Sequence, residues 1–67
     1  MKNIEEIRKS KGVTLVDIAD LLGVDYRTVR SKINGVTDFS FGETVAIKKV
    51  FFPEYELEYL FSERDEA

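Results

Sequence analysis

The 67-residue chain contains no cysteine and no histidine. The absence of cysteine excludes disulfides and thiol chemistry, and the usual zinc sites need cysteine or histidine ligands. No run of residues approaches the roughly 20 apolar positions of a membrane span, and the N-terminal segment lacks the apolar core of a signal peptide. We therefore expect a cytoplasmic protein that holds no metal ion and contacts no membrane.

Sequence patterns for catalysis are missing too. The chain has no glycine-rich phosphate loop and no serine with a histidine partner, and its carboxylates have no neighbours that imply a raised pKa. With 43% hydrophobic residues, a chain of this length supports one compact core but no deep substrate cavity. We expect a single domain with no enzymatic activity, no cofactor and no small-molecule substrate.

The net charge of -3 is unevenly distributed along the chain. Residues 1–36 carry seven basic and five acidic side chains, a balance of +2, whereas residues 37–67 carry three basic and eight acidic ones, a balance of -5. Positive potential is therefore local to the N-terminal half. We expect the acidic half to face away from a nucleic acid or to meet another protein.

Capping signals predict where two of the helices begin. In a capping box, the N-cap residue and the residue three positions later each accept a hydrogen bond from the other's backbone N–H. This spacing occurs at Asn3 with Glu6 and at Ser40 with Glu43. It predicts one helix over residues 4–10 and another from about residue 41 to the stop before Pro53. On the second of these, the apolar residues expected to face the core are Phe41, Val45, Ala46, Val50 and Phe51.

The stretch from Thr14 to Gly35 predicts two further short helices joined by a tight turn. Thr14 is a good N-cap for the first, Gly23 supplies the left-handed residue that ends it, and Asp25 is the N-cap of the second. The apolar stripe expected on the first helix is Leu15, Ile18, Ala19, Leu21 and Leu22. This arrangement is that of a helix-turn-helix.

The second helix of this pair, from Tyr26 to Asn34, has two different sides. Val29 and Ile33 are four residues apart and share one side, which we expect to face the core. The opposite side carries basic and hydrogen-bonding residues, and no acidic residue occurs between Tyr26 and Thr37. Nine helical residues span about 13 Å, which suits a major groove about 12 Å wide.

The C-terminal segment allows two interpretations. From Glu54 to Phe61 the sequence first alternates polar and apolar residues like a strand, while Leu57, Leu60 and Phe61 share a helical face. We favour a short fifth helix and keep a strand as the alternative. The aromatic residues gathered here either close the core or form part of an exposed dimer surface.

A set of small and apolar residues carries a family resemblance: Ile18, Ala19, Leu22, Gly23, Val24, Val29, Asn34 with Gly35, and the LxYLF ending from Leu57 to Phe61. In this order they resemble the Cro/repressor (XRE-type) helix-turn-helix family of phage and bacterial regulators. The resemblance implies an all-α, compact bundle of about five short helices, the lambda repressor-like DNA-binding domain, over residues 1–61. The charged residues at 62–67 predict a short tail after this domain. The chain departs from the family at Leu15, where a phosphate-contacting glutamine is frequent, and at Lys32 and Ile33.

The resemblance places the base-reading positions at Tyr26, Arg27, Thr28 and Ser31. Their chemistry fits, because arginine can bind guanine O6 and N7 with two hydrogen bonds and hydroxyl groups can bond several base edges. We expect phosphate contacts at Lys9, Thr14, Arg30, Lys32, Asn34 and Gly35. The alternatives are that the cations form an ordinary solvated surface, that Lys9 only complements a helix dipole, and that Asn34-Gly35 is an ordinary turn.

Together these features favour a transcriptional regulator, a Cro-like repressor that inserts the helix from Tyr26 to Asn34 into the major groove of a double-stranded DNA operator. A homodimer through the C-terminal half is expected, because one short helix reads few bases. The rival interpretation is a protein-interaction module on a helix-turn-helix scaffold, such as an antirepressor or antitoxin. Net acidity and Leu15 after the cap favour this rival.

Overall fold

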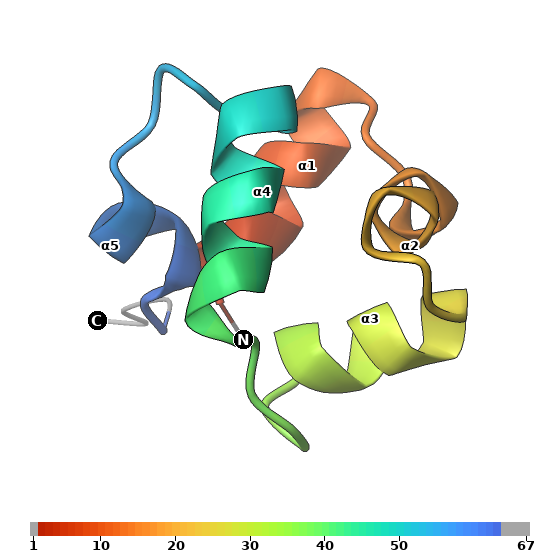
Figure 1. Cartoon of the computed structure of the whole chain (residues 1–67). Coiled ribbons are helices and arrows are strands. Elements are labelled where there is room, and N and C mark those ends of the chain that lie inside the picture. Colours follow the sequence, from red (N-terminus) through yellow and green to blue (C-terminus); the bar gives the residue numbers. More distant parts are fainter. Residues whose placement is uncertain (1, 64–67) are drawn as a thin grey trace.

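Five helices follow one another along residues 2–63, the part of the chain that the computed structural model describes (Figure 1). They are α1 (Asn3–Lys11), α2 (Leu15–Leu22), α3 (Tyr26–Ile33), α4 (Phe41–Phe51) and α5 (Leu57–Phe61). Within these residues there is no strand, and the one extended pairing is an isolated antiparallel bridge between Lys2 and Glu63. The prediction of an all-α fold is confirmed. The C-terminal segment is helical over α5, so the strand alternative is wrong.

Two helices begin as the capping signals predicted. The Thr14 hydroxyl accepts a hydrogen bond from the Asp17 backbone N–H at 3.0 Å, and the Asp17 carboxylate accepts one from the Thr14 backbone N–H at 2.9 Å. Ser40 and Glu43 exchange the same two bonds at 3.1 and 2.8 Å. Both helix starts are therefore fixed by reciprocal side-chain bonds that satisfy otherwise unpaired amides.

The capping box predicted at Asn3 is wrong. Helix α1 begins at Asn3 itself, its N-cap is Lys2, and no side chain caps it. The Asn3 amide group instead donates a hydrogen bond to the Tyr59 carbonyl oxygen at 2.9 Å, and the Asn3 backbone N–H bonds the Ser62 carbonyl oxygen at 3.0 Å. Asn3 thus joins the start of α1 to α5, a long-range contact that takes precedence over the local cap.

The core lies where all five helices meet. Each of them contributes buried side chains, and the loop after α4 adds Phe52; the buried residues are Ile4, Ile7, Ile18, Ala19, Val29, Ile33, Ile47, Phe52 and Leu60. The stripe predicted for α2 is confirmed, with Ile18 and Ala19 buried and the three leucines half-buried against them. The inward pair predicted for α3 is confirmed as well.

The core face predicted for α4 is wrong at its centre. The fully buried residue is Ile47, whereas Phe41 is 76% and Val50 56% exposed. Apolar residues occur on every side of α4, so helical periodicity alone does not fix its rotation. Packing against α2 on one side and α5 on the other selects the buried side.

Figure 1 shows how these contacts arrange the helices. Helix α4 lies across the middle with α1 behind it, α5 to one side and α2 to the other, and α3 runs along the lower edge. Helices α2 and α3 form the most extensively packed pair. In the part of the chain that the structure describes, no helix has the length and apolar character needed to cross a membrane.

Candidate nucleic-acid interface

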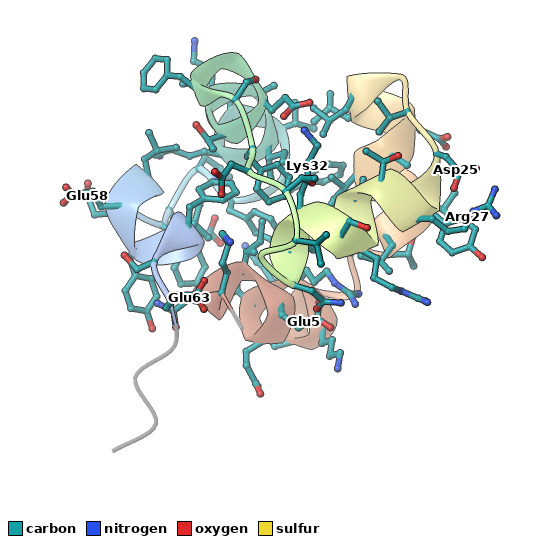
Figure 2. All side chains as sticks on the ribbon, turned by 90° about the horizontal axis from the view of Figure 1, so that it is seen from below. Glu5, Asp25, Arg27, Lys32, Glu58 and Glu63 are labelled. Atoms are coloured by element: carbon teal, nitrogen blue, oxygen red, sulfur yellow. The ribbon has the colours of Figure 1, made fainter. Side chains whose placement is uncertain are left out.

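Helix α3 is held against the body of the molecule by one side only. Three residues join it to α2, beginning with Gly23, whose φ of 71° is left-handed and ends α2. Val24 packs against the core, and Val29 and Ile33 are 0% and 2% exposed. Two buried anchors four residues apart fix the rotation of α3 about its own axis. Its other side consequently faces outward, as the view from below shows (Figure 2).

The four residues expected to contact bases lie at the surface, but to different degrees. The side chain of Arg27 is 75% exposed, and Tyr26 is 42% exposed. Thr28 and Ser31 are half-buried, and their short side chains extend less far from the helix than those of Tyr26 and Arg27. A ligand that reaches all four must fit closely along α3.

Arg27 is paired with the cap of its own helix. The Asp25 carboxylate accepts hydrogen bonds from the Arg27 backbone N–H at 2.8 Å, from Nε at 3.0 Å and from Nη2 at 3.0 Å. The side-chain hydrogen bond from Arg27, more than any other contact, lowers the pKa of Asp25 to about 2, and the same pairing raises the pKa of Arg27. Sequence reasoning identified Asp25 only as a cap. The signal for the ion pair was an aspartate at an N-cap two residues before an arginine.

Two guanidinium groups lie near the ring of Tyr26. Its centroid is 5.9 Å from Cζ of Arg27 and 5.7 Å from Cζ of Arg30. At such distances the negative face of an aromatic ring attracts a cation. The first two turns of α3 therefore carry two exposed cations gathered around one tyrosine.

A cleft of about 270 Å³ lies between α1, α2 and α3, lined by Glu5, Arg8, Lys9, Leu15, Arg30, Ile33 and Asn34. It brings together Lys9, Arg30 and Asn34, three of the six residues expected to contact phosphate. Glu5 is the only carboxylate in the lining, and it pairs with Arg8 at 2.6 Å and with Lys9 at 3.5 Å. Three cations against one carboxylate give the cleft a positive balance, which suits an anion.

The remaining residues expected to contact phosphate lie outside this cleft. The Thr14 hydroxyl is used as the cap of α2. Gly35 is exposed with a left-handed φ of 85°, and its N–H donates to the Lys32 carbonyl oxygen at 3.3 Å.

Lys32 is placed differently from the expectation of a cation free to meet phosphate. Its side chain is only 16% exposed and points from α3 toward α4, where Nζ donates to the Glu43 carboxylate at 2.9 Å and to the Asp38 carbonyl oxygen at 3.3 Å (Figure 2). Lys2 in turn donates to the Lys32 carbonyl oxygen at 3.3 Å. These contacts hold the C-terminal end of α3 in place. They depend on residues distant in sequence and were missed for that reason.

Within residues 2–63 there is no cluster of three or more acidic side chains arranged to hold a metal ion. Comparisons of the chain with protein-family models, with curated proteins and with solved structures found no match.

Proposed function

We propose that this protein is a sequence-specific regulator that binds double-stranded DNA through a helix-turn-helix formed by α2 and α3. The observation that carries the proposal is that one side of α3 is buried and apolar while exposed cations lie elsewhere on the helix. Val29 and Ile33 are buried, while Arg27 and Arg30 are exposed and lie near the ring of Tyr26. A helix of eight residues is about 12 Å long, which matches the width of the major groove.

The proposal assigns different tasks to two groups of side chains. Tyr26, Arg27, Thr28 and Ser31 read base edges; none of the four is buried, and the first two are exposed. Lys9, Arg30 and Asn34 hold the sugar-phosphate backbone at the cleft between α1 and α3. Phosphate contacts fix the register of the protein on the duplex, and base contacts select the sequence.

Lys32 has a positioning role in this scheme. Its ammonium group is committed to Glu43 and to the carbonyl oxygen of Asp38. It therefore fixes the end of α3 relative to α4, instead of contacting phosphate as the sequence suggested.

A two-fold dimer extends the proposal, with repression by occlusion of a promoter as its use. Dimers of such domains read half-sites one helical turn apart, about 34 Å. The C-terminal half exposes Phe41, Val50 and Tyr59, apolar area that a second copy would cover. Light scattering during gel filtration should show a dimer on the selected duplex. A complex with a single protomer would remove the dimer from the proposal.

The test of DNA binding is an unbiased selection of bound duplexes from a random pool. We expect enrichment of a short consensus, repeated with two-fold symmetry if the dimer forms. A pool that stays random after repeated rounds would contradict sequence-specific binding.

The exposed apolar residues of the C-terminal half also favour a second function, that of a protein-interaction module. Phe41 and Val50 are more than half exposed, and residues 37–67 carry eight acidic side chains against three basic ones. Such a module predicts negligible duplex binding even at low salt. Substitutions on α3 would then leave binding to the protein partner unchanged.

A further inference from the structure

We infer that Asp25 is a specificity-determining residue that orients Arg27 to read a guanine end-on. This inference rests on the proposed function. In the view of Figure 2, Asp25 and Arg27 lie together at the outer end of α3, pointing away from the body of the molecule. Arg27 would be the reading group, and Asp25 would act through it.

The guanidinium group of Arg27 has two usable edges. Asp25 takes the edge formed by Nε and Nη2, with both distances at 3.0 Å. Of the five N–H donors of an arginine, the pairing leaves three: two on Nη1 and one on Nη2. The guanidinium group of Arg27 forms no other hydrogen bond within residues 2–63, so its outer edge, formed by Nη1 and Nη2, is open.

The open edge has the chemistry of a guanine reader. One N–H from Nη1 and one from Nη2 point outward in parallel, and this pair matches the O6 and N7 acceptors that guanine shows in the major groove. Adenine has a donor at the position of O6 and cannot accept both bonds. The ligand class at this position is therefore a guanine base.

Two contacts fix the guanidinium before DNA arrives. Asp25 is itself fixed, because its carboxylate also accepts the Arg27 backbone N–H at 2.8 Å as the cap of α3. The ring centroid of Tyr26 is 5.9 Å from Cζ of Arg27, a distance at which the ring still attracts the cation. An arginine held in this orientation cannot turn to make a different set of bonds with adenine, so the wrong base loses more binding than it would beside an unrestrained arginine.

The substitution Asp25→Asn separates the two roles of Asp25, which are pairing with the Arg27 guanidinium and capping α3. The asparagine Oδ1 can still accept the Arg27 backbone N–H, and asparagine caps helices about as well as aspartate. Its Nδ2, however, replaces the oxygen that accepts Nη2 and places a donor against a donor. Asp20→Asn is the matched control, because it removes the same charge from an exposed position on α2.

The test uses the duplex selected by the wild-type protein and the same duplex with each guanine in turn replaced by adenine. The quantity measured is the guanine ratio, the dissociation constant of the adenine-substituted duplex divided by that of the selected duplex. A good bidentate contact gives a ratio of roughly ten to a hundred. We expect one guanine to show this ratio with the wild-type protein and with Asp20→Asn. With Asp25→Asn the ratio should fall severalfold but stay above one, while circular dichroism shows an unchanged helix content. Arg27→Ala should abolish it, and Asp25→Asn added to Arg27→Ala should have no further effect on it.

Three results would overturn the inference. The first is a guanine ratio that does not fall in Asp25→Asn. The second is a guanine ratio that falls equally in Asp20→Asn. The third is a selected site at which Arg27→Ala weakens the preference for no guanine. Each of them leaves DNA binding by the protein intact, so it contradicts this inference alone. A wild-type protein that binds no duplex contradicts the proposed function, and the inference fails with it.

Discussion

Helices α3 and α4 follow each other in the chain but use their apolar residues in opposite ways. On α3 the aliphatic side chains are Val29 and Ile33, both buried, and the outward side carries cations and hydroxyl groups. On α4 only Ile47 is buried, while Phe41 and Val50 are exposed. A helix with one apolar stripe presents a polar surface that suits a charged partner. A helix that is apolar on all sides leaves apolar area for a protein partner.

The largest expected effect tests whether the two helices really differ in what they bury. Ile33→Ala should lower the free energy of unfolding by about 2 to 5 kcal/mol, because it empties part of the core. Val50→Ala should change it by less than about 0.5 kcal/mol, since that side chain is on the surface. Urea unfolding followed by circular dichroism measures both. Equal losses would mean that the burial assigned to α3 and α4 is incorrect.

The next effect separates two kinds of contact around α3. Arg27→Ala should weaken binding to the selected duplex by about 1 to 3 kcal/mol and relax its base preference. Lys9→Ala should cause a smaller loss that is the same on selected and random duplexes, because phosphate contacts carry no sequence information. Fluorescence anisotropy on both duplexes provides the comparison. Equal losses from Arg27→Ala on the two duplexes would contradict its base-reading role.

Acid should loosen the connection between the two helices. The pKa of Glu43 lies below its usual value near 4.5, first because the Ser40 backbone N–H bonds its carboxylate and then because Lys32 does. This stabilisation is present above pH 4.5 and is lost as the pH falls through the lowered pKa. We expect a loss on the order of 1 kcal/mol in the free energy of unfolding. In Glu43→Gln, most of this dependence of the free energy of unfolding on pH should disappear. An unchanged pH dependence in that variant would show that Glu43 does not contribute.

The smallest effect uses two glycines in opposite settings. Gly42 lies on the exposed side of α4, and a Cβ there would meet no atom within 4 Å. Gly42→Ala should therefore stabilise the protein by about 0.5 to 1 kcal/mol. Gly12→Ala should destabilise it by about 1 kcal/mol, because φ is 74° there and left-handed backbone disfavours a Cβ. Thermal midpoints that shift in the same direction would refute this contrast.

The difference between α3 and α4 also explains what the sequence could predict. Val29 and Ile33 share the only apolar stripe of α3, so periodicity alone identified its inward side. On α4 the same reasoning missed Ile47, because apolar residues surround the helix and only packing against α2 and α5 selects among them. Local capping chemistry predicted the starts at Thr14 and Ser40, because the two partners of each capping box are only three residues apart.

The parts of the candidate site that escaped prediction depend on contacts between distant residues. Lys32 meets Glu43 eleven positions later, and Asn3 meets Tyr59 at the other end of the chain. No local pattern indicates either pairing. The cleft that gathers Lys9 with Arg30 likewise exists only after folding has placed α1 near α3. The residue types were readable from the sequence, but their grouping was not.

The central claim, that the outward side of α3 and the neighbouring cleft bind DNA, is tested most directly by salt titration of duplex binding. If Lys9 and Arg30 each neutralise one phosphate, the log-log slope should be about -1.8 or steeper per protomer, at about -0.9 for each contact. The variants Lys9→Ala and Arg30→Ala should each reduce the slope by about 0.9. Negligible duplex binding at the lowest salt concentration, or a slope unchanged in both variants, would contradict the claim.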